Sequence, residues 1–174
     1  MKKIIIRNGT YAFLCAFLLF IVVLYAGLGL DFGLQEVLGY LTIITSLAFI
    51  FPAIESYREN VNNGVVSFKN ALLIGLAISA LAGIGFAIAD TLYVVFINPD
   101  FAQQYFEYSL EKMENELPLE EFEIKKAELE GQIAQYNNPA FNAIVMFLTV
   151  FLMGTLISII SAFILQRKKL IHRQ

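Results

Sequence analysis

The sequence contains one cysteine and one histidine, too few for most catalytic or metal-binding sites. Cys15 lies inside an apolar run, and without a second thiol neither an intrachain disulfide nor a thiolate metal cluster can form. His172 lies in a charged tail, so the apolar segments offer no histidine-paired nucleophile and no histidine metal ligand. Zinc-protease, nucleophile-elbow and phosphate-loop motifs are absent too. We therefore expect no catalytic residues, no metal and no cofactor, and predict that the protein is not an enzyme.

Basic residues are scarce where the acidic ones gather. Residues 98–138, which we call the acidic arm, hold ten of the fifteen acidic residues and only three lysines. Binding of nucleic acid requires Lys and Arg clustered on a structured face, so the charge distribution excludes that class of partner. The arm also lacks the ligand spacing of an EF-hand, and solvated helix faces explain its acids more simply than calcium binding.

Hydrophobic residues make up 58% of the chain, against roughly 45 to 50% in a soluble domain. Four apolar runs, at about residues 11–30, 35–53, 69–97 and 139–165, are each long enough to cross a hydrocarbon core of roughly 30 Å. The first run follows basic residues as in a signal peptide, but it exceeds the roughly 7 to 15 residues of a signal core. The sequence predicts one integral membrane domain over residues 1–174, an all-α fold with a four-helix transmembrane bundle.

The flanks of these runs predict the orientation. Nine of the twelve basic residues lie at the N-terminus, between the second and third runs, or at the C-terminus, namely Lys2, Lys3, Arg7, Arg58, Lys69, Arg167, Lys168, Lys169 and Arg173. With four crossings these three segments share one side, and basic flanks mark the cytoplasmic side. We expect both termini in the cytoplasm and the arm outside. Arg167, Lys168, Lys169 and Arg173 act as a plain topology anchor or bind anionic membrane lipid.

The acidic arm has the pattern of a helical hairpin between the third and fourth membrane helices. Asn98 before Pro99 is typical of a helix start, and Asn138 before Pro139 repeats this signal at the fourth run. Pro118 should divide the arm into two helices. Each half has an apolar stripe at helical spacing, with Phe106, Leu110, Met113 and Leu117 in the first and Leu119, Phe122, Leu129, Ile133 and Tyr136 in the second.

These stripes should be buried against each other or against a partner. The leading hypothesis is a non-enzymatic membrane protein whose arm contacts an envelope protein or a second copy of the chain, through Phe106, Leu110, Met113, Phe122, Leu129 and Ile133. An acidic helical spacer that contacts nothing is the alternative.

Asp90 is the ionisable residue placed well inside a membrane run. A charge near the bilayer centre costs at least about 2.5 to 3.5 kcal/mol, so this side chain should face the bundle or water. One interpretation is a proton or cation site with hydroxyl groups such as that of Thr91, which implies a small transporter or channel component. The other is an aspartate that fixes helix packing.

Small residues recur every four positions in the last two runs, including Gly75, Ser79 and Gly83 in the third and Gly154 and Ser158 in the fourth. Such spacing lets helix backbones approach closely in lipid. We expect the two stripes to pack the bundle; a homodimer contact is the alternative.

The order of several short stretches resembles the bacterial membrane-protein family catalogued as domain of unknown function 4199. The matching stretches are Glu36–Leu41, Tyr57-Arg58, Asn63-Gly64, Ser67-Phe68, Pro99–Phe101, Tyr136–Pro139, Gly154 and Ser158–Ala162. The resemblance implies a four-helix protein of the bacterial inner membrane and brings no established activity.

Overall fold

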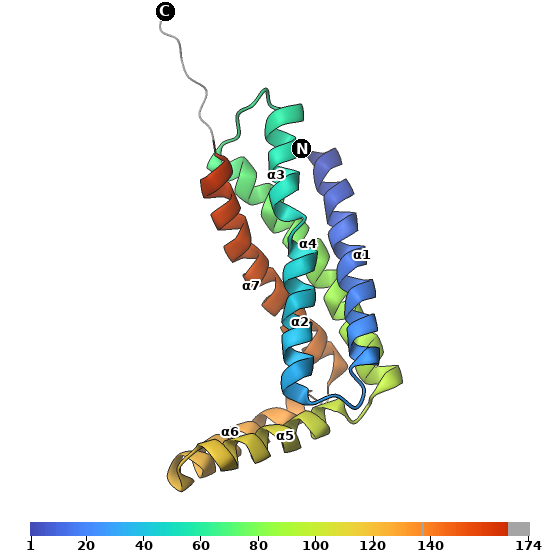
Figure 1. The fold of residues 1–174 in the computed structure, drawn as a ribbon, viewed down its shortest axis with the longest axis vertical. Coiled ribbons are helices and arrows are strands. Elements are labelled where there is room, and N and C mark those ends of the chain that lie inside the picture. Colours follow the sequence, from blue (N-terminus) through green and yellow to red (C-terminus); the bar gives the residue numbers. More distant parts are fainter. Residues whose placement is uncertain (137, 167–174) are drawn as a thin grey trace, which may run out of the picture.

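The computed structural model describes residues 1–136 and 138–166, and every regular element in them is a helix (Figure 1). The helices are α1 (Lys2–Ala26), α2 (Phe32–Leu47), α3 (Ile50–Asn60), α4 (Phe68–Leu92), the π-helix η1 (Tyr93–Ile97), α5 (Phe101–Glu116), α6 (Leu119–Tyr136) and α7 (Pro139–Leu165). The basic tail Arg167, Lys168, Lys169 and Arg173 lies outside the described residues.

Four stretches are long and apolar enough to cross a membrane, and they are Lys2–Ala26, Phe32–Asn60, Phe68–Ile97 and Pro139–Leu165. The first starts well before the predicted residue 11, because the polar residues ahead of the apolar run also adopt helix. It ends at Ala26 rather than at residue 30, in a turn where Gly29 has a φ of +86°. That backbone conformation favours glycine.

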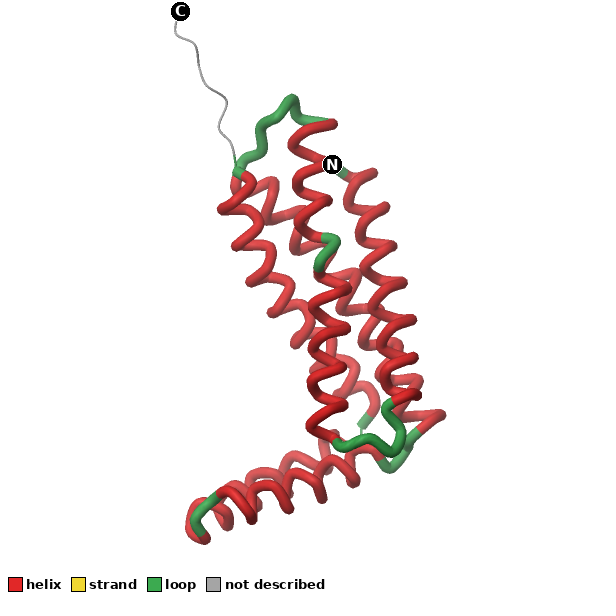
Figure 2. Tube along the Cα trace, viewed as in Figure 1, coloured by secondary structure: helices red, strands yellow, loops and turns green. Residues whose placement is uncertain are grey.

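The second stretch is broken, where the sequence predicted one helix over 35–53. Figure 2 shows the short interruption between α2 and α3, at Ala48 and Phe49. Pro52 explains it, since proline has no N–H for the carbonyl of Ala48 and its ring crowds that carbonyl. The break therefore lies one turn before the proline.

Helix α4 lies at the centre of the bundle and contacts α1, α2, α3 and α7. Its buried face includes Ile74, Ile78, Ala82 and Phe86, all fully buried. Ser67 caps its start by accepting a hydrogen bond from the N–H of Asn70 (3.2 Å).

Helices α5 and α6 contact each other and lie across one end of the bundle, extending to its side (Figure 1). We call this the arm end. The start of α1, the end of α3 and the end of α7 lie together at the opposite end.

The two Asn-Pro signals of the arm had different outcomes. Asn138 caps α7 as predicted, accepting from the N–H of Ala140 (3.0 Å) with Pro139 at the first helical position. The prediction for Asn98 was wrong, because α5 begins at Phe101. The N–H of Asn98 instead bonds to the carbonyl of Tyr93 (2.9 Å), five residues back, and so closes the π-helix. Pro118 separates α5 from α6, as predicted.

Candidate functional site

Aromatic side chains attach the arm to the bundle. The ring of Phe32, at the start of α2, lies 6.0 Å from that of Phe101, 5.9 Å from that of Tyr105 and 5.2 Å from that of Tyr108 between centroids. The ring of Tyr93 lies 5.6 Å from that of Phe101. Because such contacts bury large apolar surfaces, they fix the first two turns of α5 against α2 and η1.

A hydrogen bond strengthens this attachment. The hydroxyl of Tyr105 donates to Glu36 Oε1 on α2 at 2.5 Å. Burial, followed by the hydrogen bond to Glu36 and its negative charge, raises the pKa of Tyr105 to about 12. The phenol therefore stays protonated at neutral pH and keeps donating.

A cavity of about 330 Å³ lies between the bundle and the arm. The bundle contributes its lining residues from α4, η1 and α7, which are Asp90, Val94, Asn142, Val145, Met146 and Thr149. The arm contributes mostly apolar and aromatic residues from α5 and α6, which are Phe101, Ala102, Tyr105, Phe106, Leu129, Ile133 and Tyr136. We call it the junction cavity, since neither part encloses it alone.

Two polar groups of the junction cavity lack partners. Asp90 is 9% exposed, and no described residue donates a hydrogen bond to its carboxyl group or forms an ion pair with it. Asn142 donates from Nδ2 to the carbonyl of Tyr136 (2.7 Å), while its Oδ1 is buried with no partner among the described residues. Thr149, by contrast, donates to the carbonyl of Val145 (2.9 Å) within its own helix.

The π-helix begins three residues after Asp90 in the chain. Residues Tyr93–Ile97 form it, and Val94 within it lines the junction cavity. A π-turn inserts extra backbone into a helix and is frequent at functional sites. This irregularity and the two unpartnered polar groups occur at the same place in the fold.

The structure brings together two sets of residues that the sequence had kept separate. Asp90 lies in the junction cavity with Phe106, Leu129 and Ile133 of the predicted arm surface. The other three arm residues, Leu110, Met113 and Phe122, are half-buried but do not line the cavity. Sequence reasoning missed Asn142, although a side-chain amide inside an apolar run was a visible signal.

Thr91 does not join Asp90. Its hydroxyl donates to the carbonyl of Ala87 (2.8 Å), and it lines a separate groove between α4 and α7. That groove also contains Ile88 and Ile144, which are among the exposed apolar residues. Thr91 therefore faces the outside of the bundle rather than the junction cavity.

The small residues of α4 and α7 meet reciprocally. A Cβ atom at Gly75 would lie 2.5 Å from the Cβ of Ser158, and one at Gly154 would lie 2.5 Å from the Cβ of Ser79. Each serine thus occupies space left by a glycine on the other helix, and each donates to a carbonyl in its own helix, Gly75 or Gly154. Gly83 lies against Phe147 of α7 in the same way, with 2.9 Å from a Cβ to the ring.

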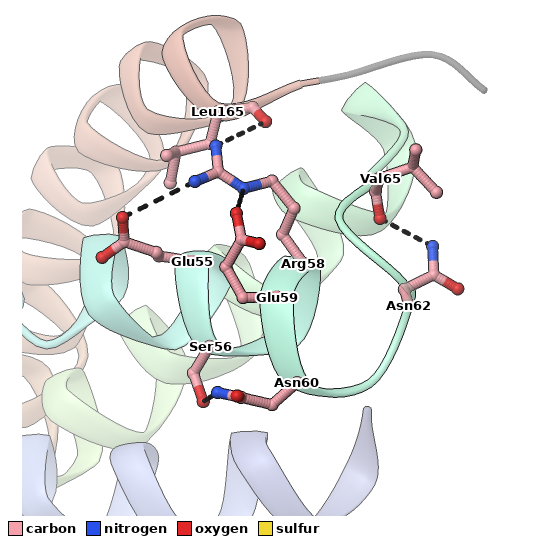
Figure 3. Close-up of polar contacts among 8 residues, drawn as sticks. All are labelled: Glu55, Ser56, Arg58, Glu59, Asn60, Asn62, Val65 and Leu165. Carbon is pink, nitrogen blue, oxygen red and sulfur yellow. Dashed lines mark hydrogen bonds and ion pairs between the residues drawn. The ribbon is translucent and has the colours of Figure 1, made fainter. Parts of the chain in front are cut away.

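At the end opposite the arm, a buried arginine joins α3 to α7 (Figure 3). Arg58 donates from Nη1 to the carbonyl of Leu165 (3.4 Å), the last residue of α7. Its Nε donates to Glu59 (2.6 Å), and Nη2 lies 3.6 Å from Glu55. The cation lies at the negative end of the α7 dipole, a stabilising position.

Among the described residues, no group of three or more His, Cys, Asp or Glu side chains is arranged to hold a metal ion. A sequence model of the family described as "Protein of unknown function (DUF4199)" matches residues 7–167. No curated protein and no solved structure matches the chain.

Proposed function

The chain belongs to the DUF4199 family of unknown function, and we propose that it is a non-enzymatic binding protein of the bacterial inner membrane. The bundle spans the membrane with both termini in the cytoplasm, and the acidic arm lies outside and covers a binding site. One observation carries this proposal: the junction cavity is lined by both parts and contains the buried, unpartnered carboxyl group of Asp90. A partly apolar pocket with a few convergent polar groups is the usual form of a small-molecule site.

The charge distribution along the bundle supports the orientation. Lys2, Lys3 and Arg7 belong to the first turns of α1, at the end of the bundle opposite the arm, and Arg58 belongs to the last turn of α3 at that same end. The arm end has the acidic helices α5 and α6. Because positive residues are retained on the cytoplasmic side, this asymmetry favours an external arm.

Packing below the junction cavity favours binding over transport. Ile78, Ala82 and Phe86 on α4 and Val150 on α7 are fully buried. Transport through a single copy would require this part of the core to open. Asp90 therefore fits a site reached from one side better than a step in a path across the bundle.

A contact between the arm and a protein partner is a second candidate function. Leu119 is 75% exposed and Ile124 is 63% exposed, both in the first turns of α6. An envelope protein or a second copy of the chain would bind at these residues. Such a contact would use the free end of the arm and leave the junction cavity unobstructed.

Cysteine labelling tests the orientation and the cavity together. In a Cys15→Ala background, single cysteines at Asp90, Leu119, Lys3 and Ile88 are treated with a membrane-impermeant thiol reagent in spheroplasts. We expect Leu119→Cys and Asp90→Cys to be labelled, and Lys3→Cys to be labelled only after permeabilisation. Ile88→Cys, on the exposed apolar face of α4, is the matched lipid-facing control and should stay unlabelled.

Two results would contradict the proposal. Labelling of Lys3→Cys in intact spheroplasts, without labelling of Leu119→Cys, would invert the orientation. Labelling of Leu119→Cys without any labelling of Asp90→Cys would mean that water does not reach the junction cavity from outside.

A further inference from the structure

We propose that the junction cavity binds a hydrophobic amine in its ammonium form, with Asp90 as the counter-ion. This inference rests on the proposed binding function and names the chemical class of its ligand. Its basis is the combination, in one cavity, of apolar walls and a carboxyl group without a partner among the described residues.

Asp90 supplies the preference for a cation. Asp90 is 9% exposed, and no described residue contributes a donor or a positive charge to its carboxyl group. A buried carboxylate is costly unless it is paired and hydrogen-bonded. A protonated amine brings both the charge and the N–H donors that the protein leaves out.

The walls determine the rest of the ligand. Phe101, Phe106, Leu129 and Ile133 present apolar surface, so the body of the ligand should be hydrophobic. The aromatic faces also attract a cation. A bare metal cation fits poorly, since Ca²⁺ requires about six to eight oxygen ligands and the lining side chains offer few. An anionic ligand would be repelled by Asp90.

Three probes of one shape test the charge requirement, and they are adamantan-1-amine, adamantan-1-ol and adamantane-1-carboxylate. The full chain is reconstituted in lipid nanodiscs, and binding of tritiated adamantan-1-amine is measured, with empty discs to subtract partitioning into lipid. We expect saturable binding of the amine. The alcohol should compete about tenfold less well or worse, because hydrogen bonds to charged groups are worth more than neutral ones. The carboxylate should not compete.

A variant assigns the effect to Asp90. Asp90→Asn should weaken binding of the amine at least about tenfold, to the level of the alcohol. Asp100→Asn is the matched control, since Asp100 is exposed at the start of α5 and does not line the cavity. If Asp90→Asn does not fold, two tests remain. Ala102→Leu fills the cavity from the arm and should weaken binding of the amine. The comparison of the three probes is made on the wild type and needs no variant.

Equal binding of the amine and the alcohol, or unchanged binding of the amine by folded Asp90→Asn, would overturn the assignment of an ammonium ligand and leave the binding function standing. If no probe binds saturably but Asp90→Cys is labelled from outside, the assignment of an ammonium ligand is likewise overturned and the binding function stands. Without either binding or labelling, the proposed function itself would fail.

Discussion

The hydroxyl of Tyr105 donates to the carboxylate of Glu36 at 2.5 Å, across 69 positions of sequence. This hydrogen bond joins α5 of the arm to α2 of the bundle. It lies beside the junction cavity, which Tyr105 also lines. The position of the arm over the cavity therefore depends on a polar contact as well as on aromatic packing.

Tyr105→Phe should loosen the arm without unfolding the bundle. The substitution keeps the ring and removes one donor, so we expect a loss of at most about 1 kcal/mol, because the contact is partly exposed. Hydrogen exchange should accelerate in α5 and α6 and stay unchanged in α4. Tyr11→Phe is the matched control, since no described residue bonds to the Tyr11 hydroxyl. Equal exchange in α5 of both variants would contradict a role for this bond.

The same hydrogen bond predicts a dependence on alkaline pH. The folded state raises the pKa of Tyr105 from 10.0 to about 12, mainly through burial and then through Glu36. The protonated phenol is thus favoured by folding, and its contribution is complete below pH 10 and lost as the pH rises toward 12. The difference in melting temperature between the wild type and Tyr105→Phe should be constant below pH 10 and shrink above it. A difference in melting temperature that grows above pH 10 would contradict the raised pKa of Tyr105 in the folded state.

The four helical stretches long and apolar enough to cross a membrane could be predicted from the sequence because helix length and apolarity are local properties. The break between α2 and α3 follows from Pro52, but its place one turn earlier depends on which carbonyl loses its donor. Asn98 and Asn138 precede proline alike, yet only Asn138 caps a helix: its Oδ1 accepts from the N–H of Ala140, whereas the side chain of Asn98 donates to Gln104 and its N–H closes the π-helix.

The junction cavity could not be predicted in this way. The sequence predicts Asp90 as a membrane-embedded polar site and predicts the two arm stripes that contain Phe106, Leu129 and Ile133. Their meeting, however, depends on the direction in which the arm leaves the bundle. The contacts of Phe32 with Phe101, Tyr105 and Tyr108 set that direction. Such contacts between distant segments have no periodic signal in the sequence.

Gly75→Ala should destabilise the bundle. The new Cβ would overlap Ser158 Oγ and would lie 2.5 Å from its Cβ, in a fully buried contact. Overpacking of this kind costs about 1 to 3 kcal/mol, which lowers the melting temperature in detergent. Adding Ser158→Gly should recover part of the loss, because it removes the atoms that clash. Gly39→Ala, at a position with nothing within 4 Å of a Cβ, is the control and should melt like the wild type.

Arg58→Gln should release the last turn of α7. Arg58 is 7% exposed, and its Nη1 lies 3.4 Å from the carbonyl of Leu165, so the substitution removes a cation from the negative end of the helix and leaves a shorter neutral amide in its place. Its two carboxylate partners are about half exposed and can return to water, which limits the loss to about 1 to 3 kcal/mol. Hydrogen exchange should accelerate around Ala162 and Leu165 and stay unchanged at the arm end. Arg7→Gln, at an exposed position of α1, removes the same charge without this contact. If both variants accelerated exchange in α7 equally, the net charge of this end would matter and the bond to Leu165 would not.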